Sequence, residues 1–174
     1  MKLSTIFSFL LVTNIVFSKE SAISSPFPLL GNKEDRSELL RSMIYHEGPI
    51  PIPYHYLAPD GSEIRLLTEV PNGGFAHCLL PPRAITEAMQ HQTVEEIWHF
   101  LEGEGLLWRN QHGKDNLTPL SKGTTVVISP GVPFQFRNTG DEPLVFLIVT
   151  MPPWPGPSEA LKASHYWKLD VSLN

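Results

Sequence analysis

Two side chains that can exchange protons lie five residues apart near the middle of the chain. His91 and Glu96 belong to the stretch HQTVEEIWHFLEGEG, which covers residues 91–105. A buried carboxyl beside an imidazole can move protons without a metal, so the pair is a candidate acid and base for isomerisation, epimerisation or dehydration. In apolar surroundings the pKa of Glu96 should rise, unless His91 pairs with it.

Two other histidines are secondary candidates for the same site. His99 stands three residues after Glu96, so a regular strand places the two side chains on opposite faces. Only a bulge would turn His99 inward. His77 lies on the preceding predicted strand, and the direction of its side chain depends on the strand register. The single cysteine, Cys78, is expected to be a buried apolar residue, and it can form no disulfide within the chain.

The elements that position these residues are predicted to be β-strands. The chain has 17 prolines and 12 glycines among 174 residues, and this content excludes a long-helix or coiled-coil protein. Clusters of proline, glycine and asparagine separate short runs of β-forming residues, as in a sandwich, jelly roll or barrel. The predicted strands are Glu63–Val70, Phe75–Leu80, Ile85–His91, Glu95–Glu102, Leu106–Arg109, Thr124–Ile128, Phe134–Arg137 and Leu144–Thr150.

The first 18 residues have the layout of a secretory signal peptide. Lys2 precedes an uncharged run, residues 3–17, and the small residue Ser18 offers a cleavage site. The alternative is a membrane-anchored N-terminal helix. We expect a secreted or periplasmic protein that has no membrane contact in its mature form. Residues 19–48 form an extension with a possible helix at Asn32–Ile44, residues 49–157 the barrel, and residues 158–174 a tail.

Charge and length limit the partners. The formal net charge is −5 and there is no long basic run, so nucleic acid is excluded as a partner. The 41% of hydrophobic residues are enough for one packed core in one domain. The triplet Asn116-Leu117-Thr118 is a glycosylation sequon that matters only in a eukaryotic host.

Two motifs in the chain resemble those of the cupin superfamily. His91, Glu96 and Gly103 have the spacing of the latter part of the first cupin motif. Gly123, Gly131 and Asn138 occupy glycine and asparagine positions of the second, although its proline falls one place late, at Pro130. The resemblance covers residues 54–157 and implies a double-stranded β-helix, a jelly-roll barrel.

The resemblance also implies a metal site that this chain has partly lost. Metal-binding cupins use two histidines and a glutamate from the first motif and a histidine from the second. Here Met89 stands in the first histidine position and Phe134 in the last, which leaves His91 and Glu96. Two ligands bind a divalent transition metal weakly, and His77 or His99 would have to complete the set. The cofactor is therefore unknown, and there may be none; the alternative to a metal is a hydrogen-bonded His91–Glu96 pair.

Alternation along the strands predicts an aromatic pocket around this pair. We expect a small-molecule ligand or substrate there, and three functions remain open: an isomerase or lyase that uses His91 and Glu96, a non-catalytic cupin that binds a sugar or another ligand, and a metal-dependent oxygenase-like cupin with a reduced ligand set. The Pro-rich arm Pro49–Pro53 could cover a sheet edge in a homodimer. The residues expected to point inward are Met89, Trp98, Phe100, Phe134 and Phe136.

Overall fold

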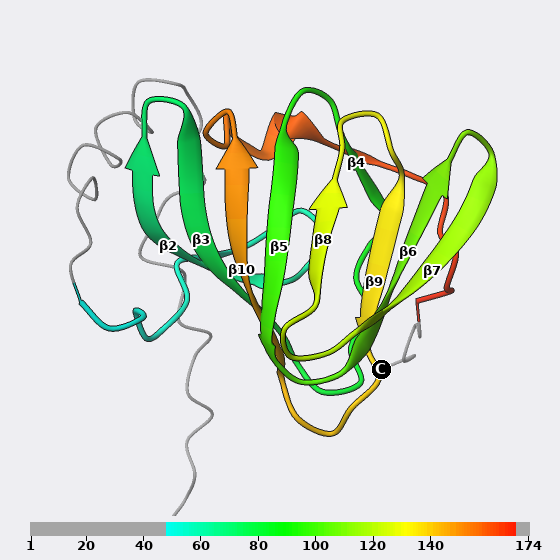
Figure 1. Ribbon diagram of the computed structural model, residues 1–174, viewed down its shortest axis with the longest axis horizontal. Helices are drawn as coiled ribbons and strands as arrows, with labels where there is room; N and C mark the ends of the chain where they lie inside the picture. The colour runs from blue at the N-terminus through cyan, green and yellow to red at the C-terminus, as the bar shows by residue number, and fades with distance from the viewer. Residues whose placement is uncertain (1–47, 170–174) are drawn as a thin grey trace, which may run out of the picture.

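Two antiparallel sheets make up the computed structural model, which describes residues 48–169 (Figure 1). The larger sheet has six strands in the order β1-β2-β3-β10-β5-β8, and the smaller has five in the order β11-β4-β9-β6-β7. Within residues 48–169 the other regular element is a short 3-10 helix, η1 (Pro157–Glu159). The predicted all-β jelly roll is therefore confirmed. The predicted signal peptide and the predicted helix at Asn32–Ile44 lie outside the described residues.

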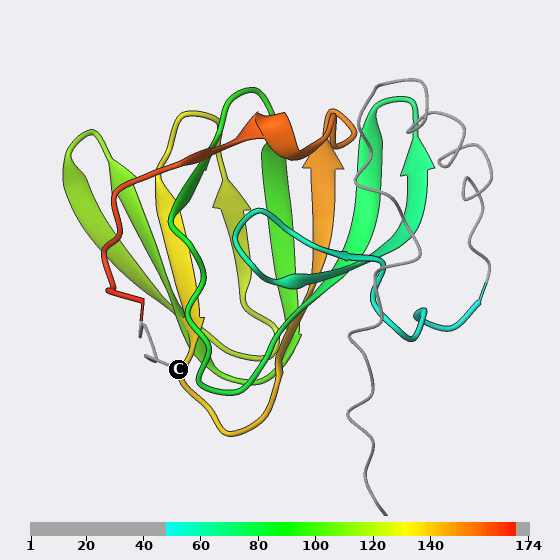
Figure 2. The same ribbon diagram turned by 180° about the vertical axis from the view of Figure 1, so that it is seen from behind.

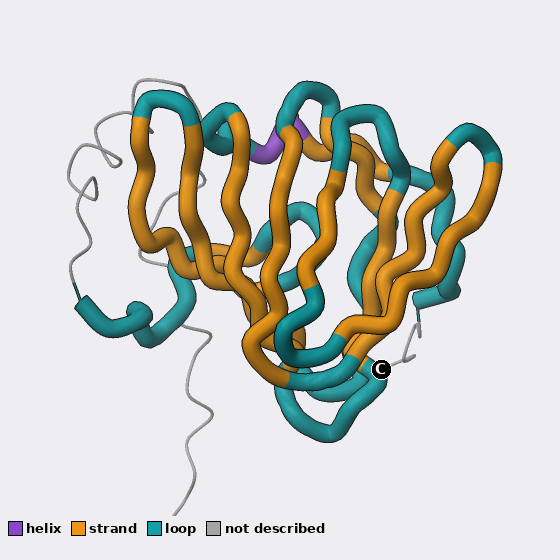
Figure 3. Tube along the Cα trace, in the orientation of Figure 1, coloured by secondary structure: helices purple, strands orange, loops and turns teal. Residues whose placement is uncertain are grey.

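The strands are short and separated by tight turns, as Figure 3 shows. In chain order they are β1 (Tyr56–Leu57), β2 (Glu63–Val70), β3 (Gly73–Leu80), β4 (Met89–His91), β5 (Glu95–Glu102), β6 (Gly105–Gln111), β7 (Lys114–Leu120), β8 (Thr125–Ile128), β9 (Phe134–Asn138), β10 (Leu144–Met151) and β11 (Ala160–Lys162). In the described part of the chain, no helix is long and apolar enough to cross a membrane.

Two segments differ from the predicted strands. The predicted strand Ile85–His91 is regular only at its end, as β4, because Thr86 binds the Phe136 backbone through both its N–H and its hydroxyl. Strand β7 was predicted as part of a turn. The turn is in fact only His112 and Gly113, with φ of 53° and 74°, the two positive values that a two-residue hairpin loop requires.

The space between the sheets is filled mainly by aromatic side chains. Trp98, Phe100 and Phe146 point inward from the larger sheet, and Phe134 and Phe136 from the smaller. The Trp98 ring centroid lies 5.5 Å from that of Phe134, 5.1 Å from that of Phe136 and 4.9 Å from that of Phe146. All five residues are at most 2% exposed, so this aromatic layer joins the two sheets into one core.

Two segments cross the open side of the barrel, as the view from behind shows (Figure 2). The loop between β1 and β2 lies beside the segment before β4, where the Glu87 N–H donates to the Asp60 carbonyl. The chain after η1 returns along the smaller sheet, where Tyr166 stacks on Trp108 at 5.3 Å. The buried Gln135 side chain accepts hydrogen bonds from the N–H groups of Tyr166 and Trp167, which fastens this segment.

Candidate active site

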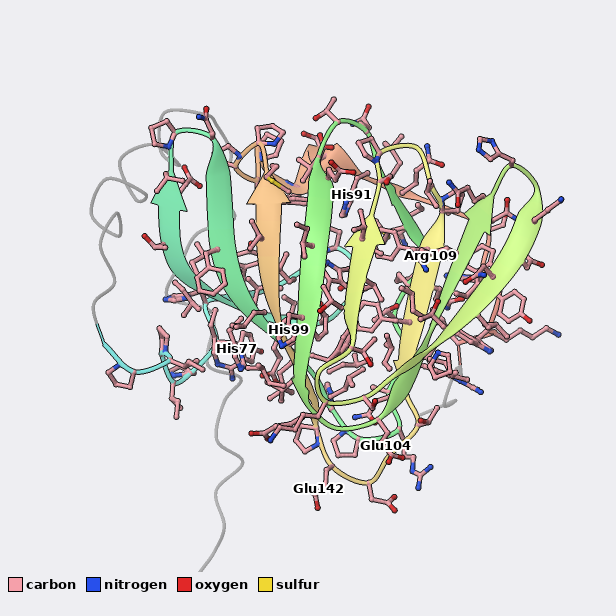
Figure 4. All side chains as sticks on the ribbon, viewed as in Figure 1. His77, His91, His99, Glu104, Arg109 and Glu142 are labelled. Atoms are coloured by element: carbon pink, nitrogen blue, oxygen red, sulfur yellow. The ribbon has the colours of Figure 1, made fainter. Side chains whose placement is uncertain are left out.

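His91 and Glu96 lie at the same end of the barrel, which we call the mouth. Strand β4 ends at His91 and β5 begins at Glu95, so a three-residue connection brings the two side chains to one end of the two sheets. Figure 4 shows His91 at this end, far from Glu104 and Glu142 at the opposite end. Thr150, which pairs with Glu96 in the register of β5 and β10, is also at the mouth.

Glu96 is a buried acid with one occupied oxygen. The residue is 5% exposed, and its Oε2 accepts a hydrogen bond of 2.7 Å from the Trp98 indole N–H. Burial raises the pKa of Glu96 to about 8; the Trp98 hydrogen bond works against this shift, while the charges of Asp60 and Glu159 add to it. At neutral pH Glu96 is therefore a protonated acid that can donate.

His91 is shifted in the opposite direction. Its ring lies edge-on to Phe134 at 5.1 Å and to Trp154 at 5.2 Å, and its Nδ1 is enclosed without a hydrogen-bond partner. Burial lowers the pKa of His91 to about 4, although the negative charge of Glu159 favours its protonated form. His91 is therefore neutral at pH 7, and Nδ1 is available as an acceptor when the proton is on the other ring nitrogen.

His91 and Glu96 do not pair directly. In the described residues no hydrogen bond joins them, since the Glu96 hydrogen bond comes from Trp98 and the His91 ring contacts two aromatic rings. The raised pKa of Glu96 is what burial without such a pair should produce. The mouth therefore holds an uncharged acid and an uncharged base, separated by the edges of aromatic rings.

The five residues expected to line a pocket are all on the inner faces of the sheets. Met89 and Phe134 are direct partners of β4 and β9, and each is 2% exposed. The rings of Trp98, Phe100, Phe134 and Phe136 contact one another or Phe146. These side chains form the floor below His91 and Glu96.

The two secondary candidates lie on the outer face of the larger sheet. His99 and His77 are the register partners of Leu147 on its two sides, and all three point away from the barrel. The His99 ring is within hydrogen-bonding distance of the Thr125 hydroxyl at 2.8 Å. Burial and the charge of Arg65 lower the pKa of His77. Neither imidazole can join His91 and Glu96.

These placements leave a donor set that does not fit a metal. Among residues 48–169, no three His, Cys, Asp or Glu side chains are grouped so that they could hold an ion. Arg109 is on the inner face, but its two terminal nitrogens donate to the Val127 carbonyl and the Thr118 hydroxyl. It connects β6 to β7 and β8 and leaves the mouth to His91 and Glu96.

Asp60 is a site residue that the sequence did not reveal. Its Oδ1 accepts hydrogen bonds from the Ser62 N–H at 2.9 Å and the Ser62 hydroxyl at 2.7 Å. Burial raises the pKa of Asp60, and its charge raises the pKa values of Glu96 and Cys78, so its carboxyl reaches toward the interior. The surrounding Pro59-Asp60-Gly61 indicated only a turn.

The segment after β10 covers the mouth and was also missed. Trp154 lies against His91, and two residues of this segment hold it in place. The Glu159 carboxylate accepts hydrogen bonds from the N–H groups of Thr93 and Val94, at 2.5 and 2.7 Å, and from the Thr93 hydroxyl at 3.0 Å. Burial alone would raise the pKa of Glu159, but these hydrogen bonds lower it overall. A glutamate after a Pro-Ser pair carries no sequence signal of this role.

Comparison with known proteins relates this geometry to one group. A family model described as a cupin domain matches residues 76–150. The chain is 33% identical over 105 residues to the uncharacterized protein MJ1618 of Methanocaldococcus jannaschii, which covers 57% of this chain and 80% of that protein.

Solved structures show the same fold. One is an uncharacterized conserved protein with a double-stranded β-helix domain from Klebsiella pneumoniae, with a TM-score of 0.50, 17% identity, and coverage of 72% of this chain and 95% of that one. Another is oxalate decarboxylase from Bacillus subtilis, with a TM-score of 0.55 and 17% identity, covering 68% of this chain but 33% of that one.

Proposed function

The chain belongs to the cupin superfamily, and from this premise we propose that it is a small-molecule enzyme that moves protons at the barrel mouth. Glu96 acts as the general acid and His91 as the general base. The substrate class is a small molecule with a carbonyl group, and the reaction is an isomerisation or a related elimination of water.

One observation supports this assignment above the others. Burial shifts the two pKa values past each other, to about 8 for Glu96 and about 4 for His91. Between these values the carboxyl holds its proton and the imidazole lacks one, which is the state that an acid–base pair needs before substrate binds. A pair with ordinary pKa values would be ionised in the opposite sense at neutral pH over part of this range.

The proton transfers balance without another reactant. His91 takes a proton from the carbon next to the substrate carbonyl, while Glu96 donates its proton to the carbonyl oxygen. The C–H bond breaks, a C=C bond forms, and the product of this half-reaction is an enol. Return of the proton from His91 to a different carbon, with recovery of a hydroxyl proton by Glu96, completes an isomerisation. Trp154 covers His91, so the substrate displaces this ring as it enters.

A metal-dependent oxygenase is not supported by the residues present. Of the four ligand positions that the cupin motifs provide, two hold Met89 and Phe134, and Phe134 has no donor atom. The remaining His91 and Glu96 are oriented by aromatic rings and by the Trp98 N–H. No step is routed through a metal here.

Hydrogen–deuterium exchange tests the proposed chemistry without knowledge of the natural substrate. We would incubate the protein in D2O with small ketones, hydroxyketones and aldehydes, and follow deuterium at the carbon next to the carbonyl by NMR. Glu95 is a matched control because it neighbours Glu96 in β5 but is exposed. The expected result is exchange by the wild type and Glu95→Gln, and a loss of about a hundredfold or more in His91→Ala and Glu96→Gln.

Each other outcome rejects the enzymatic assignment. Equal exchange rates in all four proteins would show that the chemistry, if any, is elsewhere. Binding of a probe without exchange would assign the chain instead to the alternative function, a ligand-binding cupin. Neither exchange nor binding with any probe would reject the carbonyl substrate class.

We also propose that the protein is exported. This rests on the uncharged run after Lys2 and the small residue Ser18. N-terminal sequencing of the mature protein should begin at Lys19, and an intact Met1 would contradict the proposal.

A further inference from the structure

The outer face of the larger sheet is apolar where an antiparallel sheet that faces water is usually polar. Phe75, Val149, Ile97 and Val127 are register partners in that order across β3, β10, β5 and β8, so they form one continuous row. Ile97 is 37% exposed and Val127 is 43% exposed. Four neighbouring strands thus present an apolar row on the outside of the barrel, and the view of Figure 1 faces these strands.

The next row carries no formal charge at neutral pH beyond its imidazoles. It consists of His77, Leu147, His99 and Thr125, again register partners in that order. Burial and the positive charge of Arg65 lower the pKa of His77, which keeps its imidazole neutral. We call the two rows together the outer patch.

Charged side chains lie around the outer patch and not within it. Glu95 and Glu102 are at the two ends of β5. Arg65, on β2, forms an ion pair with Glu63 at 3.0 Å, and its Nε donates to the Pro51 carbonyl. The latter contact places the arm of residues 48–53 beside the patch, with Ile50 42% and Ile52 91% exposed.

We propose that the outer patch is the interface with a second copy of this chain. In a two-fold dimer, any charge near the axis would meet the same charge of the other copy, and the outer patch has none there. Two twisted sheets can pack face to face with their strands nearly aligned. A partner of different charge would not require a charge-free centre, so this feature favours a second copy.

The size of the face is consistent with this occupant. Four strands about 4.8 Å apart and eight residues long, at about 3.3 Å per residue, cover roughly 500 Å². A stable interface buries about 800 Å² on each partner. The arm with Ile50 and Ile52 adjoins the patch and can supply the remaining area.

The test is the oligomeric state of the mature chain, residues 19–174, measured by light scattering after size exclusion and by sedimentation. The wild type should have twice the mass of one chain. The double substitution Ile97→Lys with Val127→Lys places four like charges in the interface and should weaken association by about a hundredfold or more. Leu117→Lys is the control, because Leu117 is 46% exposed on β7 of the other sheet, and it should remain dimeric.

Two results would overturn the proposal. A monomeric wild type would show that another occupant, such as residues 19–47 of the same chain, covers the face. A double variant that stays dimeric would place the interface elsewhere, for example at the sheet edges. If the double variant does not fold, Ile97→Cys replaces it: Cys78 is 1% exposed, so a bismaleimide should cross-link Ile97→Cys dimers but not Leu117→Cys. Absence of that cross-link would reject the interface.

Discussion

Glu96 and His91 owe their unusual protonation to the same cause, which is burial without a pairing charge. Glu96 receives one indole N–H, and His91 receives two aromatic edges. A direct ion pair would have held the carboxyl ionised and the imidazole protonated. The aromatic residues at Trp98, Phe134 and Trp154 therefore decide the chemistry of the site by keeping the two groups neutral.

This protonation makes a prediction about stability that needs no substrate. Glu96 has a pKa of about 8 in the folded state against 4.5 as its model value, so the unfolded state releases its proton first as pH rises. The contribution of Glu96 is fully present below pH 4.5 and is lost between pH 4.5 and 8, at about 1.4 kcal/mol per pH unit. His91 acts oppositely, between its model value of 6.5 and about 4. From pH 6.5 to 8 only the Glu96 loss of these two remains.

The expected difference is therefore clearest above pH 6.5. The unfolding free energy of the wild type should fall by about 2 kcal/mol more than that of Glu96→Gln between pH 6.5 and 8. Denaturant titrations at several pH values measure it, and Glu95→Gln should keep the slope of the wild type. Parallel curves for the wild type and Glu96→Gln would show that Glu96 ionises normally in the folded protein.

At this scale, motif spacing could find Glu96 and His91 but not Asp60. His91 and Glu96 are near in sequence and occur in a motif with fixed spacing. Asp60 reaches the interior because its turn folds across the open side of the barrel, and a Pro-Asp-Gly turn has the same sequence whether it faces water or the core. The direction of a turn depends on tertiary packing, which local sequence does not encode.

Among the elements, the strands of the two motifs were the most predictable. Strands β2 and β5 begin and end at their predicted residues, because alternation and flanking turn residues both mark them. Strand β7 was hidden by its polar sequence, since five of its seven residues are exposed at the edge of the smaller sheet. An edge strand with little buried surface has little hydrophobic pattern to detect.

Two motif residues act on the fold and not on the mouth. Gly103 has a φ of 80°, and a Cβ there would collide with the Pro143 carbonyl, so the turn after β5 requires glycine. Asn138 donates from Nδ2 to the carbonyls of Leu80, Pro81 and Glu142, and its Oδ1 accepts from the Gly140 N–H. Motif identity therefore predicts the barrel better than it predicts a function.

The segment that covers the mouth should depend on one carboxylate. Glu159→Ala leaves the N–H groups of Thr93 and Val94 and the Thr93 hydroxyl without their acceptor. The expected cost is about 2–4 kcal/mol, with faster amide hydrogen exchange at Thr93 and Val94. Denaturant unfolding and exchange followed by NMR measure the two effects. Ser158→Ala is the control, because only the backbone of Ser158 takes part in a hydrogen bond here; an equal loss in both variants would remove the special role of Glu159.

At the scale of the whole molecule, pairing between distant strands determines the fold. β3 and β5 flank β10, although β10 follows them by many residues in the chain. Sequence could indicate that strands exist and that a jelly roll joins them, but the register that brings Ile97 beside Val127 and Val149 appears only in the structure. The apolar outer patch consequently could not be predicted from any single strand.

The same long-range pairing predicts that the barrel opens as one unit. Cys78 is the one cysteine of the chain, is 1% exposed, and lies on β3 between β2 and β10. Burial raises the pKa of its thiol well above the ordinary value, so the native protein should not react with a thiol reagent. Labelling should begin only as the sheets separate, and its denaturant midpoint should coincide with that of the circular dichroism signal. Labelling at lower denaturant would mean that β2, with the arm beside it, leaves the sheet before the aromatic core unfolds.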